Sequence, residues 1–261
     1  MVAEPPKDVP DYLLADPVAP ELMWGKGSLG STVLALRGGH LDVLEKMADC
    51  YAERFRKSWR DLREGLAVFM APSREHERRA RHSSGLVESL GAAMGLAVVA
   101  LASTTLRVRG EGRSGDPDES FYIGRKAEAY LEMERSGVAE TEIHAWADDQ
   151  PADLVVEVEH THYDETKRGT YRDAGAAELW ELATPQAGKD ARIIQLQAPE
   201  GPLLVGASEL MPGVRGDGIA DALAVLRRVG GLIELGRAME RGEPVADELL
   251  QAVGAQGRDG S

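Results

Sequence analysis

Residues 153–182 read DLVVEVEHTHYDETKRGTYRDAGAAELWEL. The first part of this stretch is mostly apolar, which predicts a buried strand over 153–159. Residues 164–174 then predict a helix, with Gly175 as its C-terminal cap. Apolar residues return at 178–183 and predict a second strand. The chain's other expected strands cluster around this stretch, which indicates a mixed α/β fold.

Two glutamates stand at the end of the first strand. Successive side chains of a strand point to opposite faces, so Glu157 and Glu159 share one face, about 6 to 7 Å apart. Unpaired carboxylates at such a distance raise each other's pKa, more so where water is partly excluded. A divalent cation reverses this cost, because Mg²⁺ takes oxygen ligands and is usually held by one or two carboxylates plus water. The pair is therefore a candidate metal site.

A third carboxylate is expected nearby. The segment GDPDESFYIG places Asp118 at the start of the preceding strand. If the two strands pair, Asp118 approaches Glu157. The alternative is that Asp118 and its acidic neighbours Asp116 and Glu119 only decorate a turn.

The helix after the glutamates carries a lysine. Asp164, Lys167 and Tyr171 are spaced by three and four residues, so they share one face of the helix. A strand that leads directly into this helix can aim Lys167 back over the strand's end. There an ammonium group would stabilise negative charge on a phosphate or orient an attacking water. The alternative for Lys167 is an ordinary surface pair with Asp164, and Tyr171 is expected to pack against the core.

Length and composition bound the possible classes of protein. The chain has 261 residues, enough for one large domain with extensions or for two small domains, and 43% of the residues are hydrophobic. The single cysteine, Cys50, excludes an internal disulfide and a zinc ribbon. No apolar run approaches the roughly 18 residues that span a membrane, and the N-terminus lacks the features of a signal peptide. A cytoplasmic protein without a membrane partner is therefore expected.

The charge of the chain bears on nucleic-acid binding. A net charge of −14 argues against broad non-specific binding, which depends on the neutralisation of phosphates by Lys and Arg. Basic residues do gather between Arg54 and Arg81. A run of this kind is typical of a solvated helix face.

The remaining sequence predicts further elements by periodicity and by turn residues. These are an irregular segment over 1–30, a helix over 41–62, a strand over 65–72, a helix over 74–95, one or two strands within 96–109, a turn-rich loop over 110–117, a strand over 119–124, a short helix over 126–136, strands over 191–197 and 202–207, a helix over 217–229 and a loose polar tail over 240–261.

Several segments in a fixed order resemble a known family. They are REGLAVFMAP (63–72), SREHERR (73–79), DPDESFYIG (116–124), ADLVVEV (152–158), DETKRGTYRDAGAAELW (164–180) and ELMPGV (209–214). This ordered set resembles the Uma-two family of endonucleases, within the restriction-endonuclease-like PD-(D/E)XK nuclease superfamily. The resemblance covers about residues 60–230.

The resemblance implies a fold and a division of the chain. It implies an α/β restriction-endonuclease-like core with a central mixed β-sheet flanked by helices, over residues 59–232. Residues 1–58 would form an N-terminal extension and residues 233–261 a polar tail. Whether the extension caps the core, forms the surface of a homodimer or recognises another partner is left open.

The resemblance also implies roles for particular residues. Asp118 matches the aspartate of PD, and Glu157 matches the acidic residue of (D/E)XK. Glu159 stands where the superfamily has its lysine, and Lys167 on the following helix is the expected substitute. Asp61 matches an upstream acidic position that often completes a metal site. The expected activity is hydrolysis of phosphodiester bonds in DNA, with Asp118, Glu157 and Lys167 as catalytic residues.

In this interpretation Asp118 and Glu157 hold one Mg²⁺ or Mn²⁺, helped by Asp61 or Glu159. A second hypothesis is a catalytically inactive nuclease-fold protein that serves as a binding or assembly module. The acidic net charge and Glu159 in place of lysine favour the second hypothesis, whereas the ordered retention of the three catalytic candidates favours the enzyme. A zinc or iron site at His160 and His162 is a further alternative, but in a continuing strand these side chains would point away from the glutamates.

Overall fold

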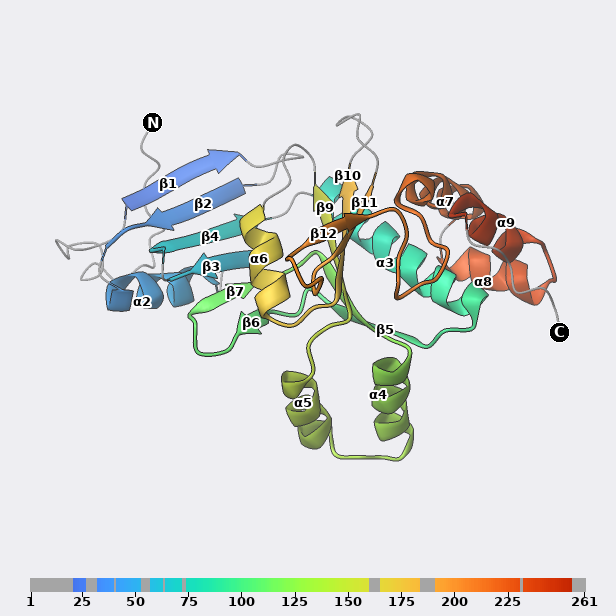
Figure 1. The fold of residues 1–261 in the computed structure, drawn as a ribbon, viewed down its shortest axis with the longest axis horizontal. Coiled ribbons are helices and arrows are strands. Elements are labelled where there is room, and N and C mark those ends of the chain that lie inside the picture. The colour runs from blue at the N-terminus through green and yellow to red at the C-terminus, as the bar shows by residue number, and fades with distance from the viewer. Residues whose placement is uncertain are drawn as a thin grey trace. The chain divides into compact units, whose positions relative to one another are not determined.

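The computed structural model describes residues 21–26, 32–39, 41–52, 57–62, 64–71, 74–159, 165–183, 191–230 and 232–254. Contacts divide the chain into two compact units (Figure 1). The first unit comprises Met1–Glu77 and Thr105–Asp116, and the second comprises Arg78–Thr104 and Pro117–Ser261. The expected domain boundaries after residues 58 and 232 stay a prediction.

The first unit is built on an antiparallel sheet. Its strands, in spatial order, are β1 (Glu21–Lys26), β2 (Thr32–Arg37), β4 (Leu66–Ala71), β3 (Lys57–Asp61), β7 (Arg113–Gly115) and β6 (Leu106–Val108). Helix α2 (Leu41–Ala52) packs on this sheet through Leu44 and Met47, which are both buried. Buried residues alternate along the strands, as at Leu34 and Leu36 in β2, because successive side chains point to opposite faces.

Three expectations for the first unit are wrong. The helix expected over 41–62 ends at Ala52, and strand β3 begins at Lys57. In β3 burial alternates residue by residue, and Trp59 is buried between polar neighbours. Strand β7 lies inside the expected loop over 110–117, and β1 lies inside the segment expected to be irregular. Strands β3 and β7 carry little apolar sequence of their own and form because neighbouring strands satisfy their backbone groups.

The second unit contains the mixed sheet that the sequence predicts. Its strands, in spatial order, are β12 (Leu203–Val205), β11 (Arg192–Gln195), β10 (Glu178–Ala183), β9 (Leu154–Glu159), β8 (Glu119–Ile123) and β5 (Val98–Ala102). Strands β9 and β10 are parallel, and the other neighbours are antiparallel. The expected α/β fold, with a central mixed sheet flanked by helices, is confirmed.

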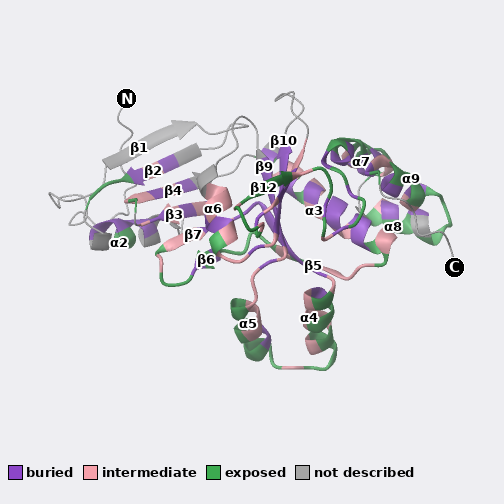
Figure 2. Cartoon of the chain, in the orientation of Figure 1, coloured by how far each residue is buried: buried purple, intermediate pink, exposed green. Residues whose placement is uncertain are grey.

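The two faces of the β9–β10 pair differ in character. Leu154 and Val156 of β9 and Trp180 of β10 share one face and belong to the main hydrophobic core. Helix α3 (Arg74–Met94) and the C-terminal helices contribute to the same core, and Figure 1 shows them on that side of the sheet. The other face carries Glu157 and Glu181, and it is covered by helix α6 (Glu165–Asp173). Both strands are buried along most of their length (Figure 2).

Helix α6 connects the two parallel strands, and Gly175 ends it as predicted. The N–H of Ala176 donates to the carbonyl of Tyr171, and Gly175 adopts a left-handed φ of 94°. A Cβ at Gly175 would lie 3.0 Å from the Cβ of Pro151, so a side chain would crowd the entry to β9. This turn directs the chain from α6 back into β10.

A pair of helices connects the end of β8 to the start of β9. Helix α4 (Arg125–Arg135) matches the expected short helix, while α5 (Glu140–Asp149) is an additional helix in a stretch where none was expected. Figure 2 shows that both are largely exposed. The ring of Trp146 meets the ring of Tyr122 edge-on, with centroids 5.5 Å apart, which ties α5 to the end of β8. Among the helices that the structure describes, none combines the length and the apolar content that crossing a membrane requires.

The expected loose tail over 240–261 is wrong for residues 240–254, the part of it that the structure describes. Helices α7 (Gly216–Val229), α8 (Leu232–Glu240) and α9 (Val245–Ala252) pack together. Helix α9 approaches α7 so closely that a Cβ at Gly218 would lie 2.4 Å from the carbonyl oxygen of Ala252. Polar residues outnumber apolar ones over 240–261, but Val245, Leu249 and Leu250 of α9 are buried in the main core.

The packing of α9 predicts a large effect of a truncation within it. Leu249 is fully buried, so Leu249→Ala should lower the free energy of unfolding by about 2 to 5 kcal/mol. Ile233 of α8 is 72% exposed, and Ile233→Ala should change that free energy by no more than about 0.5 kcal/mol. Urea unfolding of the two variants measures both changes. Equal small losses would show that α9 does not dock on the core.

Candidate functional site

Glu157 is a buried carboxylate held by two groups of the following helix. It lies near the end of β9 and is 4% exposed. Its Oε2 accepts a hydrogen bond from the Lys167 ammonium at 2.9 Å, and its Oε1 accepts one from the Tyr171 hydroxyl. Lys167 and Tyr171 are four residues apart on α6, so a single helix face presents both groups to the strand. The ammonium charge compensates the cost of burying the carboxylate.

Asp118 directly precedes β8, the strand that pairs with β9. Strand β8 pairs with β9 so that Glu119 is opposite Val156. Extending this register by one residue sets Asp118 opposite Glu157, and directly opposed residues turn their side chains to the same face. Oδ2 of Asp118 accepts a hydrogen bond from the N–H of Val158 at 2.6 Å. The Asp118 carboxylate, which is 4% exposed, is thereby held against β9 one residue beyond Glu157.

A second buried ion pair lies beside the first. Glu181 of β10 is the in-register partner of Glu157, so two carboxylates stand side by side on adjacent strands. Arg168 of α6 donates two hydrogen bonds to Glu181, at 2.7 and 2.8 Å. Each carboxylate of this pair is therefore matched by its own cation from α6. The sequence alone did not predict this pair, although the adjacent basic residues Lys167 and Arg168 were a signal for it.

The structure brings three of the five predicted site residues together. Asp118, Glu157 and Lys167 meet at the ends of β8 and β9. Asp61 ends β3 in the first unit, where its Oδ1 accepts a hydrogen bond from the N–H of Glu64 at 3.2 Å. The side chain of Glu159 lies outside the described residues. The expected contributions of Asp61 and Glu159 therefore stay predictions.

The candidate ligands suit a hard divalent cation. Asp118 and Glu157 supply carboxylate oxygens, and one or two carboxylates plus water are a usual set for Mg²⁺. Within the part of the chain that the structure describes, no group of three or more His, Cys, Asp or Glu side chains is arranged to hold a metal ion. His160 and His162, the candidates for a zinc or iron site, also lie outside the described residues. A two-carboxylate site completed by water is the form that fits the described side chains.

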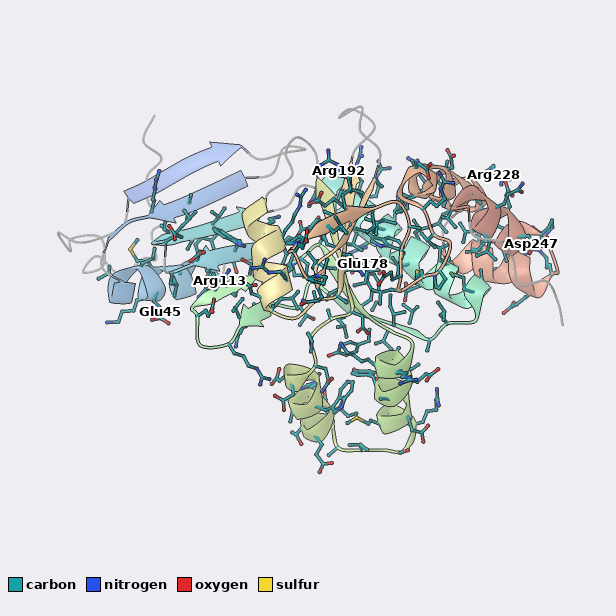
Figure 3. The ribbon with its side chains drawn as sticks, viewed as in Figure 1. Glu45, Arg113, Glu178, Arg192, Arg228 and Asp247 are labelled. Carbon is teal, nitrogen blue, oxygen red and sulfur yellow. The ribbon has the colours of Figure 1, made fainter. Side chains whose placement is uncertain are left out.

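The opposite face of β10 holds a different buried carboxylate. Oε1 of Glu178 accepts hydrogen bonds from Trp180 Nε1 and Ser208 Oγ, both at 2.6 Å. Figure 3 labels Glu178 among the side chains that fill the interior of the second unit. Burial raises the pKa of Glu178 above its ordinary value of 4.5, while its hydrogen bonds act in the opposite direction. Glu178 anchors the segment after β12 to the core and takes no part in the candidate site.

Comparison with known proteins identifies a family whose model matches the part of the chain that forms the site. A family model named Uma2 and described as "Putative restriction endonuclease" matches residues 53–189. No curated protein matches the chain. The matched segment includes β8, β9, α6 and β10 and thus all the residues of the candidate site.

Loss of the buried arginine should destabilise the fold. Arg168→Met leaves the Glu181 carboxylate, which is only 3% exposed, without its bidentate partner, and should lower the free energy of unfolding by about 3 to 5 kcal/mol. Arg228, on the outer helices in Figure 3, pairs with Glu248 in an exposed contact. Arg228→Met should cost less than about 1 kcal/mol. Guanidinium unfolding compares the two, and equal costs would argue against a buried Arg168–Glu181 pair.

Replacement of Glu178 should change how stability depends on pH. Because folding raises the pKa of Glu178, the folded chain holds this proton more tightly than the unfolded chain. The resulting stability is fully present below pH 4.5 and is lost as the pH rises through the raised pKa. The unfolding free energy of the wild type, relative to that of Glu178→Gln, should therefore fall as the pH rises through this window. Urea unfolding at a series of pH values measures the difference, and a constant difference would refute the assignment.

Proposed function

The chain belongs to the Uma2 family, and on this premise we propose that it is a metal-dependent endonuclease that hydrolyses phosphodiester bonds of DNA. The observation that carries the proposal is the buried Glu157, paired with Lys167 and flanked by Asp118 at the ends of two adjacent strands. Buried carboxylates beside a lysine are an arrangement suited to phosphoryl chemistry, in which charge must be stabilised as a phosphodiester is attacked.

Asp118 and Glu157 are the residues that would hold the cation, Mg²⁺ or Mn²⁺. When bound, such an ion lowers the pKa of a water and polarises a phosphoryl oxygen. Asp61 and Glu159 are proposed helpers of the site. The two carboxylates suit this role because the backbone of β9 and the helix α6 fix their positions before any ligand arrives.

Lys167 is the proposed electrostatic catalyst. Its ammonium lies 2.9 Å from Glu157, and its side chain is 24% exposed, so it can reach a phosphate at the site. A preorganised charge of this kind acts on the non-bridging oxygen, where negative charge develops. The lysine occupies α6 instead of the strand position of Glu159, and both locations lie at the carboxyl end of β9.

The proposal also includes DNA as the substrate, a cytoplasmic location and a homodimeric assembly. With a net charge of −14, binding to DNA would rest on local groups such as Lys167 and the metal ion and not on the overall charge of the protein. Cleavage is therefore expected to depend strongly on the divalent ion, which offsets the repulsion between the acidic site and phosphate.

A binding or assembly module without catalysis is the second candidate. It is favoured by the contacts of the carboxylates with the protein itself, since both oxygens of Glu157 and one of Asp118 accept hydrogen bonds from protein groups. Calorimetric titration with Mn²⁺ separates the two candidates. An enzyme-type site should bind the ion, and Asp118→Asn should abolish that binding.

Nuclease assays test the enzyme directly. With plasmid and single-stranded DNA, cleavage should require Mg²⁺ or Mn²⁺. Glu157→Gln should abolish most of the cleavage, because it removes a ligand of the required cation. Lys167→Met should lower the rate by about 10² to 10³, because it removes a positive charge aimed at the reacting phosphate. Glu178→Gln makes the same change on the opposite face of the sheet and should cleave at the wild-type rate.

The folded state of each variant is checked by its unfolding transition before rates are compared. Cleavage by Glu157→Gln at the wild-type rate would remove Glu157 from the mechanism. Absence of any metal-dependent cleavage by the wild type would favour the binding module instead.

A further inference from the structure

The two oxygens of Glu157 are held by chemically different groups. Tyr171 donates its hydroxyl to Oε1, and Lys167 donates its ammonium to Oε2 at 2.9 Å. Both donors come from one face of α6, so the helix grips the carboxylate at two points. The two donors differ in how they can respond to an approaching cation.

The donors differ in their freedom to move. Tyr171 is fully buried, and its ring could leave Glu157 only if the packing between α6 and the sheet opened. The Lys167 side chain is 24% exposed, and its flexible four-carbon stem can turn the ammonium into water without disturbing the core. Of the two contacts, the one with Lys167 is the exchangeable one.

They also differ in charge. An ammonium and a divalent cation that share one carboxylate oxygen repel each other, and the repulsion is strong where water is scarce. A neutral phenol hydroxyl exerts no such repulsion. A hydrogen bond to the other oxygen of a ligating carboxylate instead fixes its orientation, and groups of this kind commonly tune metal affinity.

We propose that Tyr171 is a positioning residue that holds Oε1 of Glu157 throughout, while Lys167 holds Oε2 only until a divalent cation takes that oxygen. The inference rests on the proposed metal site at Asp118 and Glu157. Lys167 then neutralises the buried carboxylate in the metal-free protein, and its ammonium becomes available to the substrate phosphate when the metal binds. Tyr171 thus acts through Glu157 and does not touch the substrate.

The test is the affinity of the full chain for Mn²⁺ alone, measured by calorimetric titration. Tyr171→Phe keeps the buried ring and removes only the hydroxyl, and it should weaken Mn²⁺ binding by about 10- to 100-fold. Lys167→Met removes the competing charge, so this variant should bind Mn²⁺ more tightly than the wild type. A purely structural role for both residues would not move the two affinities in opposite directions.

Two controls frame this comparison. Tyr122 is another buried tyrosine of the same unit, and its hydroxyl donates to the carbonyls of Ala147 and Gln150 at 3.2 Å each. Tyr122→Phe makes the same chemical change away from the site and should bind Mn²⁺ with the wild-type affinity. Glu157→Gln should abolish binding. Thermal unfolding of every variant establishes that the titrated protein is folded.

The outcomes separate the inference from the proposed function. If the wild type and Tyr171→Phe bind Mn²⁺ equally while Glu157→Gln does not bind, the role of Tyr171 is overturned and the metal site stands. If Lys167→Met loses affinity as Tyr171→Phe does, the exchange of Lys167 is overturned. If Glu157→Gln binds as the wild type does, the metal site and the inference both fall.

Discussion

The burial of carboxylates on the α6 face of the parallel strands β9 and β10 is the constraint around which the second unit is organised. In-register pairing sets Glu157 beside Glu181, and two ionised groups this close are tolerated away from water only if each is compensated. Helix α6 supplies both compensating charges, Lys167 and Arg168, from consecutive positions. The two ion pairs therefore fix the position of α6 over the ends of β9 and β10. Gly175, with its positive φ, then turns the chain from α6 into β10.

The opposite face of the same strands supplies most of the apolar stabilisation. Trp180 and its neighbours on this face pack with α3 and with the C-terminal helices in one core. Strands β9 and β10 can carry ionised groups on one face because burial of apolar area on the other face stabilises the fold. It also explains why an acidic, polar C-terminal segment docks: α9 adds a few buried side chains to an existing core and needs no core of its own.

Site chemistry follows from the same geometry. The Glu157 carboxylate is preorganised because one helix donates a hydrogen bond to each of its oxygens. The two donors, Lys167 and Tyr171, differ in mobility and in charge. The sequence was sufficient to predict that Asp118, Glu157 and Lys167 lie near one another, because strand alternation and helical spacing fix which side chains share a face and the expected pairing of two strands did the rest. It missed the contact between Tyr171 and Glu157, since a tyrosine at helical spacing is equally compatible with plain core packing. The tyrosine in fact does both, as it is buried and also donates to the carboxylate.

Local patterning alone was enough for the elements whose signals are strong: the apolar strand over 154–159, the helix that Gly175 ends, and the mixed α/β class. Hydrophobic periodicity and helix capping depend on residues close together in the sequence, so they can be predicted from the sequence alone. The pairing of β3 with β7 and the docking of helix α9 depended on the folded state, because their partners come from segments distant in sequence. The same holds for the Arg168–Glu181 pair: only the register of β10 against β9 reveals that a second carboxylate stands beside the first and requires its own cation.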